Sequence, residues 1–415
     1  MIHSNPHQIG VLACPGGAEF ADKLISELEQ LSQKGTRRKA DILAEKYKMS
    51  REQIIRQINL SIDLRPTTLN LTHPLDKIRA THYRVPAVFT RFANGEYKTE
   101  ITSTVRNNDL YIIQDVENQY PVRLNKTDSQ TYTLSINDHI FCLLVTVDAA
   151  LQAGARSVTV VLPTYPYARQ HKKKGREGLT AARVGQILEN LGVTRILTLD
   201  LHSKEIENSF NRLRVENLHA SYQILKVLHQ IVDLKDPDLV IISPDTGSVD
   251  RNKFYSTALN KALGMIYKER DYTRTSLSAT QNNITSIHLL GEVKGKTVFM
   301  ADDILGTGGT ILKAMKILND LGAKRIICAV SLPVFSGSAV ENFEEAYQQG
   351  LFYRMIGTNA IYHNERLLER EWYVSADIYQ LFARAICRLH NNRSVGSLMD
   401  NRRIIKQLLD KAMED

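Results

Sequence analysis

Short apolar runs alternate with longer amphipathic stretches along this chain of 415 residues. The runs are rich in Val, Ile and Leu, as is typical of buried parallel strands, whereas the stretches between them place apolar residues at helical spacing. In the first half, strands are expected near 9–13, 85–92, 110–114, 157–162 and 195–200, and helices near 18–33, 138–152 and 180–191. The pattern predicts an α/β fold.

The second half of the chain repeats this scheme. Strands are expected near 239–243, 264–268, 286–290, 296–301 and 325–330, and helices near 220–232, 251–263 and 309–321. Strands that alternate with crossover helices form open, doubly wound sheets. We therefore expect two similar doubly wound domains with mainly parallel sheets, which comprise residues 1–217 and 218–375.

Two segments do not fit the alternation of strands and helices. Residues 34–82 interrupt the first domain with a charged helical stretch, in which Ser50-Arg-Glu-Gln53 has the form of a capping box. In the segment 376–415, apolar residues from Ile378 to Leu389 recur at helical spacing. We expect a helical insertion at about 34–82 and a helical tail that packs back on the body.

The composition is that of an ordinary globular protein, with 43% hydrophobic and 24% charged residues. No apolar run approaches the roughly 20 residues of a membrane span, and the amino terminus lacks a secretory pattern. We therefore expect a cytoplasmic protein. Its four cysteines lie far apart in apolar segments without a C-x-x-C pair, which favours buried thiols over disulfides or a zinc site.

The charge balance is basic, with 53 Lys and Arg against 45 Asp and Glu, a net charge of +8. This excess is compatible with nucleic acid, anionic lipid or phosphorylated small molecules as partners. The densest basic run is His171-Lys-Lys-Lys-Gly-Arg176, which is either a solvated loop or part of an anion site.

The segment Asp302–Thr310 carries the most specific chemical pattern. An apolar strand ends in Asp302 and Asp303, and a loop rich in Gly and Thr then opens a helix. Open α/β sheets bind ligands at the carboxyl ends of their strands. Glycines let backbone N–H groups converge on a phosphate at the helix amino terminus, and paired carboxylates suit sugar hydroxyls or a hard metal ion. A purely structural junction is the alternative, which two acids followed by Thr-Gly-Gly-Thr disfavour.

This loop resembles the ribose-phosphate loop that phosphoribosyltransferases share with phosphoribosyl pyrophosphate (PRPP) synthetases. Further segments are similar to motifs of the synthetases, namely Arg91-Phe-Ala-Asn-Gly-Glu96, Pro166-Tyr-Ala-Arg-Gln170, Leu199-Asp-Leu-His202, Ile242-Ser-Pro-Asp245, Tyr267-Lys-Glu-Arg270 and Ser394-Val-Gly-Ser-Leu398. They occur in the family's order. By this resemblance the chain is identified as a member of the ribose-phosphate pyrophosphokinase (PRPP synthetase) family, which implies two phosphoribosyltransferase-like domains.

The resemblance also implies a role for each matching residue. ATP would be held by Phe92, Asn94, Glu96, Arg169 and Gln170. Ribose phosphate would be held by Asp302, Asp303, Thr307, Gly308, Gly309 and Thr310. His202 and Asp245 would lie at Mg²⁺, the implied cofactor, and Lys268 and Arg270 would be the catalytic cations that close over the reaction centre.

The implied reaction is attack by the anomeric hydroxyl of ribose 5-phosphate on the β-phosphorus of Mg·ATP, which yields PRPP and AMP. A phosphoribosyltransferase that consumes PRPP and a catalytically silent, synthetase-like regulatory subunit remain alternatives. In this interpretation the basic run after Gln170 attracts polyphosphate, and neither nucleic acid nor membrane is a partner. The family also implies a homo-oligomer assembled from dimers, possibly a hexamer.

The sequence departs from the family pattern at two places that bear on the substrates. Many synthetases carry a third acid in the ribose-phosphate loop, at the position where this chain has Gly306. After Gln170, the family's Asp is replaced by His171. Gly306 bears on recognition of the ribose moiety and leaves the identity of the acceptor open. His171 bears on nucleotide affinity or regulation.

Overall fold

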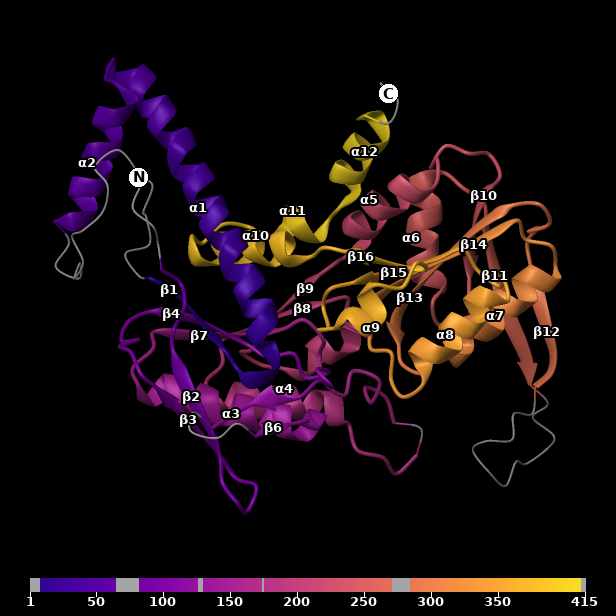
Figure 1. Cartoon of the computed structure of the whole chain (residues 1–415), viewed down its shortest axis with the longest axis horizontal. Coiled ribbons are helices and arrows are strands. Elements are labelled where there is room, and N and C mark those ends of the chain that lie inside the picture. The colour runs from indigo at the N-terminus through magenta and orange to yellow at the C-terminus, as the bar shows by residue number, and fades with distance from the viewer. Residues whose placement is uncertain (1–7, 65–81, 126–129, 174, 271–283, 412–415) are drawn as a thin grey trace.

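The computed structural model describes residues 8–64, 82–125, 130–173, 175–270 and 284–411. Two sheets organise the molecule, one in each half of the chain, and Figure 1 shows them side by side with the amino-terminal half in indigo to magenta and the other half in orange. This arrangement confirms the predicted α/β class with mainly parallel sheets. None of the helices in the described ranges is both long and apolar enough to span a membrane.

The first sheet has five parallel strands in the order β1-β4-β7-β8-β9. They are β1 (Ile9–Ala13), β4 (Asp109–Ile113), β7 (Ser157–Leu162), β8 (Arg195–Leu199) and β9 (Arg214–Leu218). Helices α3 (Ile136–Gln152) and α4 (Thr180–Leu191) follow β6 and β7 in the chain. The sequence pattern did not predict β9, because its polar residues interrupt the apolar run: Glu216 pairs with Arg195 of β8 at 3.0 Å.

A hairpin stands beside the first sheet, where the sequence predicted a single strand at 85–92. Its strands are β2 (Ala87–Arg91) and β3 (Tyr97–Ile101), which pair antiparallel. In β3 the charged Lys98 and Glu100 alternate with less polar residues over five positions, which is too short a pattern to stand out. A second small hairpin is formed by β5 (Val122–Arg123) and β6 (Thr131–Tyr132).

The second sheet has seven strands in the order β12-β11-β10-β13-β14-β15-β16. They are β10 (Leu239–Ser243), β11 (Leu263–Arg270), β12 (Ile284–Leu290), β13 (Thr297–Leu305), β14 (Arg325–Pro333), β15 (Arg354–Thr358) and β16 (Tyr373–Ala376). The pairing is parallel except between β11 and β12. The five strands expected in this half are therefore present, and β15 and β16 extend the sheet.

Helices of the second half flank this sheet. They are α5 (Ser221–Ile231), α6 (Val249–Leu259), α7 (Gly309–Asp320), α8 (Ala339–Gln348) and α9 (Glu365–Leu368). The helix expected over 251–263 ends earlier, because Asn260 adopts a left-handed conformation (φ 52°) and Leu263 already begins β11. One buried apolar cluster contains side chains of both sheets, among them Leu197 and Ile241, so the two halves share a core.

Helix α1 (Ala18–Tyr47) begins in the body, where it buries Phe20, Leu24 and Leu28. Its later part and α2 (Arg51–Asp63) form an arm that projects from the body (Figure 1). The helix expected to end near residue 33 continues through Gly35 to Tyr47. Lys48 is left-handed (φ 52°), and α2 then starts with the predicted capping box. The Ser50 N–H donates to Gln53 Oε1 at 2.9 Å, and the Gln53 N–H donates to Ser50 Oγ at 3.2 Å.

The carboxyl-terminal segment contains α10 (Tyr379–His390), α11 (Gly396–Met399) and α12 (Arg402–Lys411). Helix α10 packs on α1, where the Phe20 ring makes edge-to-face contacts with Tyr379 and Phe382 at centroid distances of 5.1 and 5.2 Å. Helix α12 packs on α5 and α6 and buries Ile405. This segment therefore contacts elements of both halves.

Candidate active site

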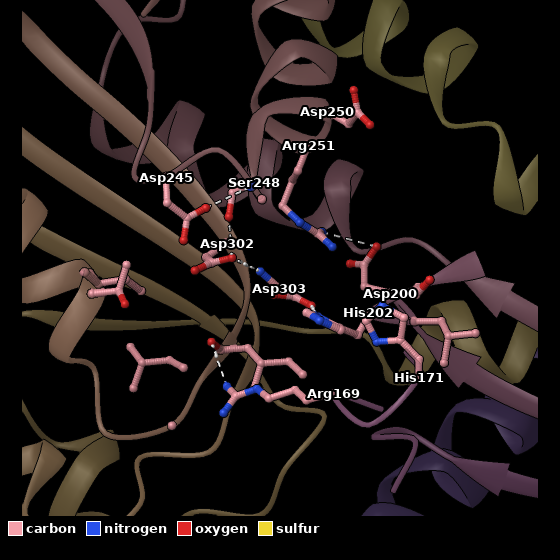
Figure 2. A pocket seen from close by; sticks show the side chains of 18 of the residues that line it. Arg169, His171, Asp200, His202, Asp245, Ser248, Asp250, Arg251, Asp302 and Asp303 are labelled. Atoms are coloured by element: carbon pink, nitrogen blue, oxygen red, sulfur yellow. Dashed lines mark hydrogen bonds and ion pairs between the residues drawn. The ribbon is translucent and has the colours of Figure 1, made fainter. Parts of the chain in front are cut away.

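A cavity of about 1170 Å³ lies where the two sheets meet. Its walls are the segment after β7, the turn after β8, the β10–α6 connection and the β13–α7 loop. These segments follow the carboxyl ends of parallel strands, which is where open α/β sheets bind ligands. Figure 2 shows that charged side chains from both halves point toward one another in this space.

The β13–α7 loop forms one wall and has the geometry of a phosphate site. As predicted, it opens a helix, and Gly308 is the N-cap residue of α7 with φ 76°. A Cβ atom at Gly308 would overlap the Phe343 ring, so both the conformation and the space require glycine. Thr307, Gly309 and Thr310 are exposed toward the cavity at the start of α7. An anion placed there would meet free backbone N–H groups and the positive end of the helix.

Asp302 and Asp303 lie side by side at the end of β13 and differ in their electrostatics. Asp302 accepts hydrogen bonds from Ser248 Oγ (2.8 Å) and from the Asp303 N–H (2.9 Å). Burial raises the pKa of Asp302, and the charges of Asp303 and Asp245 raise it further. Burial also acts to raise the pKa of Asp303, but a hydrogen bond from His202 and the charge of Arg251 outweigh it and lower that pKa.

Asp200, which belongs to the first half of the chain, lies next to Asp302 and Asp303 and bonds to residues of the second half. It follows β8 with φ 42° and accepts hydrogen bonds from His219 Nδ1 (2.9 Å), Ser331 Oγ (2.5 Å) and the Ala220 N–H (3.2 Å). Arg251 Nη1 lies 3.4 Å from Asp200 Oδ1. Although burial opposes ionisation, Arg251 and these donors hold the pKa of Asp200 well below its usual range.

Sequence reasoning assigned no role to Asp200 or Arg251. Asp200 stands within the quoted Leu199–His202 motif, which was the available signal, and Arg251 follows Asp245 by six residues. No local pattern indicates that these two side chains meet, because one follows β8 and the other belongs to α6.

Arg169 and His202 reach the cavity from the first half of the chain. Arg169 Nη2 donates to the Ile304 carbonyl oxygen at 3.4 Å, and His202 Nδ1 donates to Asp303 Oδ2 (Figure 2). The His202 ring also contacts His171 edge to face, with 5.1 Å between centroids. The two halves thus contribute adjacent groups to one cavity.

Other predicted site residues do not line the cavity. Phe92, Asn94 and Glu96 lie at the turn between β2 and β3, where Asn94 Oδ1 accepts the Glu96 N–H at 3.2 Å and Phe92 is 46% exposed. Gln170 lies next to the cavity segment, but its Oε1 accepts a hydrogen bond from Thr180 Oγ1. The backbone of Lys268 and Arg270 belongs to β11, and their side chains lie outside the described part of the structure.

The predicted metal residues both line the cavity. Asp245 Oδ1 accepts the Ser248 N–H at 3.0 Å, and His202 faces Asp303. Across the described ranges, no three His, Cys, Asp or Glu side chains are gathered as a metal-ligand group. Mg²⁺ usually binds one or two carboxylates together with waters and substrate phosphates. Asp245 and the Asp302–Asp303 pair can supply carboxylates of this kind. Burial raises the pKa of Asp302 and the charges of Asp303 and Asp245 raise it further, so a cation beside Asp302 would favour its ionised form.

Comparison with known proteins gives matches along most of the chain. The model of the N-terminal domain of ribose phosphate pyrophosphokinase matches residues 75–192, and that of the phosphoribosyl transferase domain matches residues 213–347. Ribose-phosphate pyrophosphokinase A of Dictyostelium discoideum is 32% identical over 75% of this chain and 89% of its own length. The Thermotoga maritima ribose-phosphate pyrophosphokinase is 32% identical over 74% and 88%.

A solved structure extends this similarity to the fold. Phosphoribosylpyrophosphate synthetase from Mycobacterium smegmatis superposes with a TM-score of 0.66 at 25% identity, covering 93% of this chain and 99% of the other. The arrangement of the two sheets is therefore similar to that of a solved phosphoribosylpyrophosphate synthetase.

Proposed function

The chain belongs to the ribose-phosphate pyrophosphokinase family, and we propose how its residues carry out the corresponding reaction. In that reaction the anomeric hydroxyl of ribose 5-phosphate attacks the β-phosphorus of ATP, the bond to the α-phosphate oxygen breaks, and PRPP and AMP are formed. The observation that carries the proposal is the meeting of Arg169 and His202 with Asp303 and the β13–α7 loop in one cavity. In this arrangement a site for the sugar phosphate lies next to a site for the polyphosphate of ATP.

Ribose 5-phosphate is held by the β13–α7 loop in this proposal. Its phosphate accepts hydrogen bonds from the N–H groups at the start of α7 and from the hydroxyls of Thr307 and Thr310. Asp302 and Asp303 accept hydrogen bonds from the ribose hydroxyls, directly or through metal. Ser248 and His202 fix the two carboxylates and so set the orientation of the sugar.

Mg²⁺ is the cofactor that the donor groups fit, and His202 and Asp245 with the Asp302–Asp303 pair would hold it together with the polyphosphate. His202 donates its Nδ1–H to Asp303 and thereby keeps Nε2 available as an acceptor, as is usual for imidazole ligands. The cation supplies charge neutralisation for the transferred diphosphate. The protein's part is to orient the two substrates and to stabilise the charge that develops.

The adenine contacts come from another copy of the chain in this proposal. Phe92, Asn94 and Glu96 lie on a hairpin turn that does not line the cavity of its own chain. If these residues bind ATP and the cavity binds its polyphosphate, two copies must build each nucleotide site. A homo-oligomer is therefore part of the proposed function.

Two other readings of the family resemblance are less well supported. A phosphoribosyltransferase would not account for the match of residues 75–192 to the amino-terminal domain of the pyrophosphokinases. A silent regulatory subunit would not need the acids and cations gathered in the cavity.

An assay of AMP release separates these readings. With Mg·ATP and ribose 5-phosphate, the purified chain should release AMP in an amount equal to the PRPP formed. Consumption of PRPP with a nucleobase, without AMP formation from ATP, would identify a phosphoribosyltransferase. Absence of both activities would identify a silent subunit.

A further inference from the structure

The ring of Phe343 packs against the loop that carries the proposed phosphate site. Phe343 belongs to α8 and is fully buried. A Cβ atom at Gly308 would overlap its Cε2 and lie 3.1 and 3.4 Å from its Cζ and Cδ2, so the ring touches the loop at Gly308 itself. Gly308 is the N-cap residue of α7, with φ 76°. A side chain of α8 is therefore in contact with the backbone from which the phosphate site is built.

The segment after β14 holds the first part of the same loop through its backbone. The N–H of Phe335 donates to the Leu305 carbonyl oxygen, and the N–H of Ser336 donates to the Gly306 carbonyl oxygen, both at 3.1 Å. The Phe335 ring contacts the Phe343 ring edge to face, with 5.6 Å between centroids. Hydrogen bonds thus hold the part of the loop next to β13, whereas the part next to α7 is supported by the ring of Phe343.

Further aromatic side chains pack on Phe343 and limit its movement. The ring centroids of Phe352 and Trp372 each lie 5.9 Å from that of Phe343, and the Trp372 ring is stacked on it. The Trp372 indole N–H donates to Glu344 Oε2 at 3.0 Å. Because protein interiors are close-packed, a side chain enclosed in this way cannot shift to follow a change in the loop. The ring therefore sets the position of Gly308.

The position of Gly308 decides how well a phosphate is bound, because the N–H groups that follow it must converge on one anion. Hydrogen bonds weaken when the donor is displaced or misaligned, and groups that hold a substrate must stay within about 0.5 Å of the productive geometry. A smaller side chain at position 343 would leave space into which the loop can move. The N–H groups at the start of α7 would then lose their common focus.

We propose that Phe343 is a positioning residue for the sugar phosphate, an inference that rests on the proposed function. Phe343 does not line the cavity, so it acts through Gly308 and the loop. It is a hydrophobic residue of another helix whose effect is on the affinity for ribose 5-phosphate. The affinity for ATP, whose adenine contacts lie elsewhere in the proposed function, should change much less.

Titration calorimetry of ribose 5-phosphate on the full chain tests this role. Mg²⁺ and α,β-methylene ATP are present throughout, because the methylene bridge prevents transfer of the diphosphate. Phe343→Leu should bind ribose 5-phosphate about tenfold more weakly than the wild type, which corresponds to the loss of roughly one hydrogen bond. The affinity of the variant for α,β-methylene ATP, measured separately, should stay close to that of the wild type.

Phe352→Leu is the matched control. Phe352 belongs to the same aromatic cluster and is only 5% exposed. It precedes β15, at the amino ends of the parallel strands, whereas the β13–α7 loop lies at their carboxyl ends. Both variants should lose a similar amount of stability in denaturant unfolding, but Phe352→Leu should bind ribose 5-phosphate like the wild type. Equal affinities of the two variants for ribose 5-phosphate would overturn the proposal.

A double variant shows whether the effect passes through Gly308. Gly308→Ala adds the atom that overlaps the Phe343 ring and should weaken ribose 5-phosphate binding on its own. Its effect should be smaller in the Phe343→Leu background, since both changes act on one contact. Strictly additive effects would contradict the proposal. Phe343→Met, which fills more of the space, should have an intermediate affinity, and an affinity equal to that of the wild type would count against Phe343 even if the Leu variant does not fold.

The failure of this inference is distinguishable from failure of the proposed function. If the wild type releases AMP from ATP with ribose 5-phosphate but Phe343→Leu and Phe352→Leu bind the sugar phosphate equally well, the positioning role is wrong and the function stands. If the affinities follow the predicted order without AMP release from ATP, the positioning role stands and the reaction is wrong. Absence of ribose 5-phosphate binding by the wild type would overturn both.

Discussion

At the scale of single residues, Asp200 is the point where side chains of both halves meet beside the cavity. Its carboxylate is buried and bonded to His219, Ser331 and Arg251. Asp200→Asn should lower the free energy of unfolding by about 3–5 kcal/mol, because it leaves the Arg251 cation without its partner. The lower end is expected, since 22% of the Arg251 side chain is exposed. Denaturant unfolding measures the change.

Asp250→Asn is the matched control for this variant, because Asp250 is the exposed neighbour of Arg251 in the first turn of the same helix. Its effect on the free energy of unfolding should stay below about 1 kcal/mol, which is the usual contribution of an exposed acid near a helix amino terminus. An equal loss of stability in both variants would contradict the role assigned to Asp200.

Asp115 makes the stability of the fold depend on pH, and the stability that it contributes falls as the pH rises. Burial raises the pKa of Asp115 to about 7, although it accepts the N–H groups of Tyr362 (2.9 Å) and Glu117 (3.0 Å). The folded protein therefore binds this proton more tightly than the unfolded chain. The contribution of this proton to the free energy of unfolding is fully present below pH about 4 and is lost as the pH rises toward 7.

Unfolding free energies at pH 5 and pH 7.5 measure this contribution when the wild type is compared with Asp115→Asn. The wild type should lose more stability between these pH values than the variant, in which position 115 does not titrate. Identical losses in the two proteins would show that Asp115 does not carry the proton.

At the scale of elements, β11 carries the two predicted catalytic cations. Lys268 and Arg270 both belong to this strand, which runs two residues further than the sequence pattern indicated. Lys268→Ala or Arg270→Ala should reduce kcat by about two or more orders of magnitude, because a preorganised donor to the transition state contributes roughly 3–4 kcal/mol. Steady-state AMP release measures kcat, and circular dichroism checks the fold. Near-normal turnover of both variants would exclude the assignment.

Some strands and loops could be predicted from the sequence, and others could not. The buried strands β1, β4, β7, β10 and β13 were predictable because each is an apolar run, and the β13–α7 loop because its chemistry is local. Strand β9 escaped prediction because Glu216 is matched to Arg195 on the neighbouring strand, a pairing that no local pattern contains. The end of α6 at Asn260 depends on one left-handed residue. The bonds of Asp200 and Arg169 to the second half required the tertiary structure.

At the scale of the whole molecule, the separation between the β2–β3 turn and the cavity predicts sites shared between copies. Phe92→Ala should inactivate the cavity of the neighbouring copy, and Asp303→Asn should inactivate the cavity of its own copy. The two inactive variants are mixed and allowed to reassemble at random into pairs in which each copy supplies its hairpin to the other. Half of the pairs then contain one copy of each variant. In such a pair the cavity of the Phe92→Ala copy receives an intact hairpin from the Asp303→Asn copy, so one of the two sites is intact. About one quarter of wild-type AMP release should return.

Mixing each variant with itself is the control for this experiment and should restore nothing. If the hairpin served the cavity of its own chain, the mixture of the two variants would stay inactive as well, and the shared-site arrangement would be wrong.

The central claim is the transfer of diphosphate as a unit from ATP to the anomeric hydroxyl of ribose 5-phosphate. Phosphorus NMR of the wild-type protein with Mg·ATP and ribose 5-phosphate tests it most directly, because it identifies every phosphorus-containing product. We predict equal amounts of AMP and of a sugar phosphate bearing a diphosphate at C1. Formation of ADP with a singly phosphorylated new ester, or no change in the ATP signals, would contradict the account.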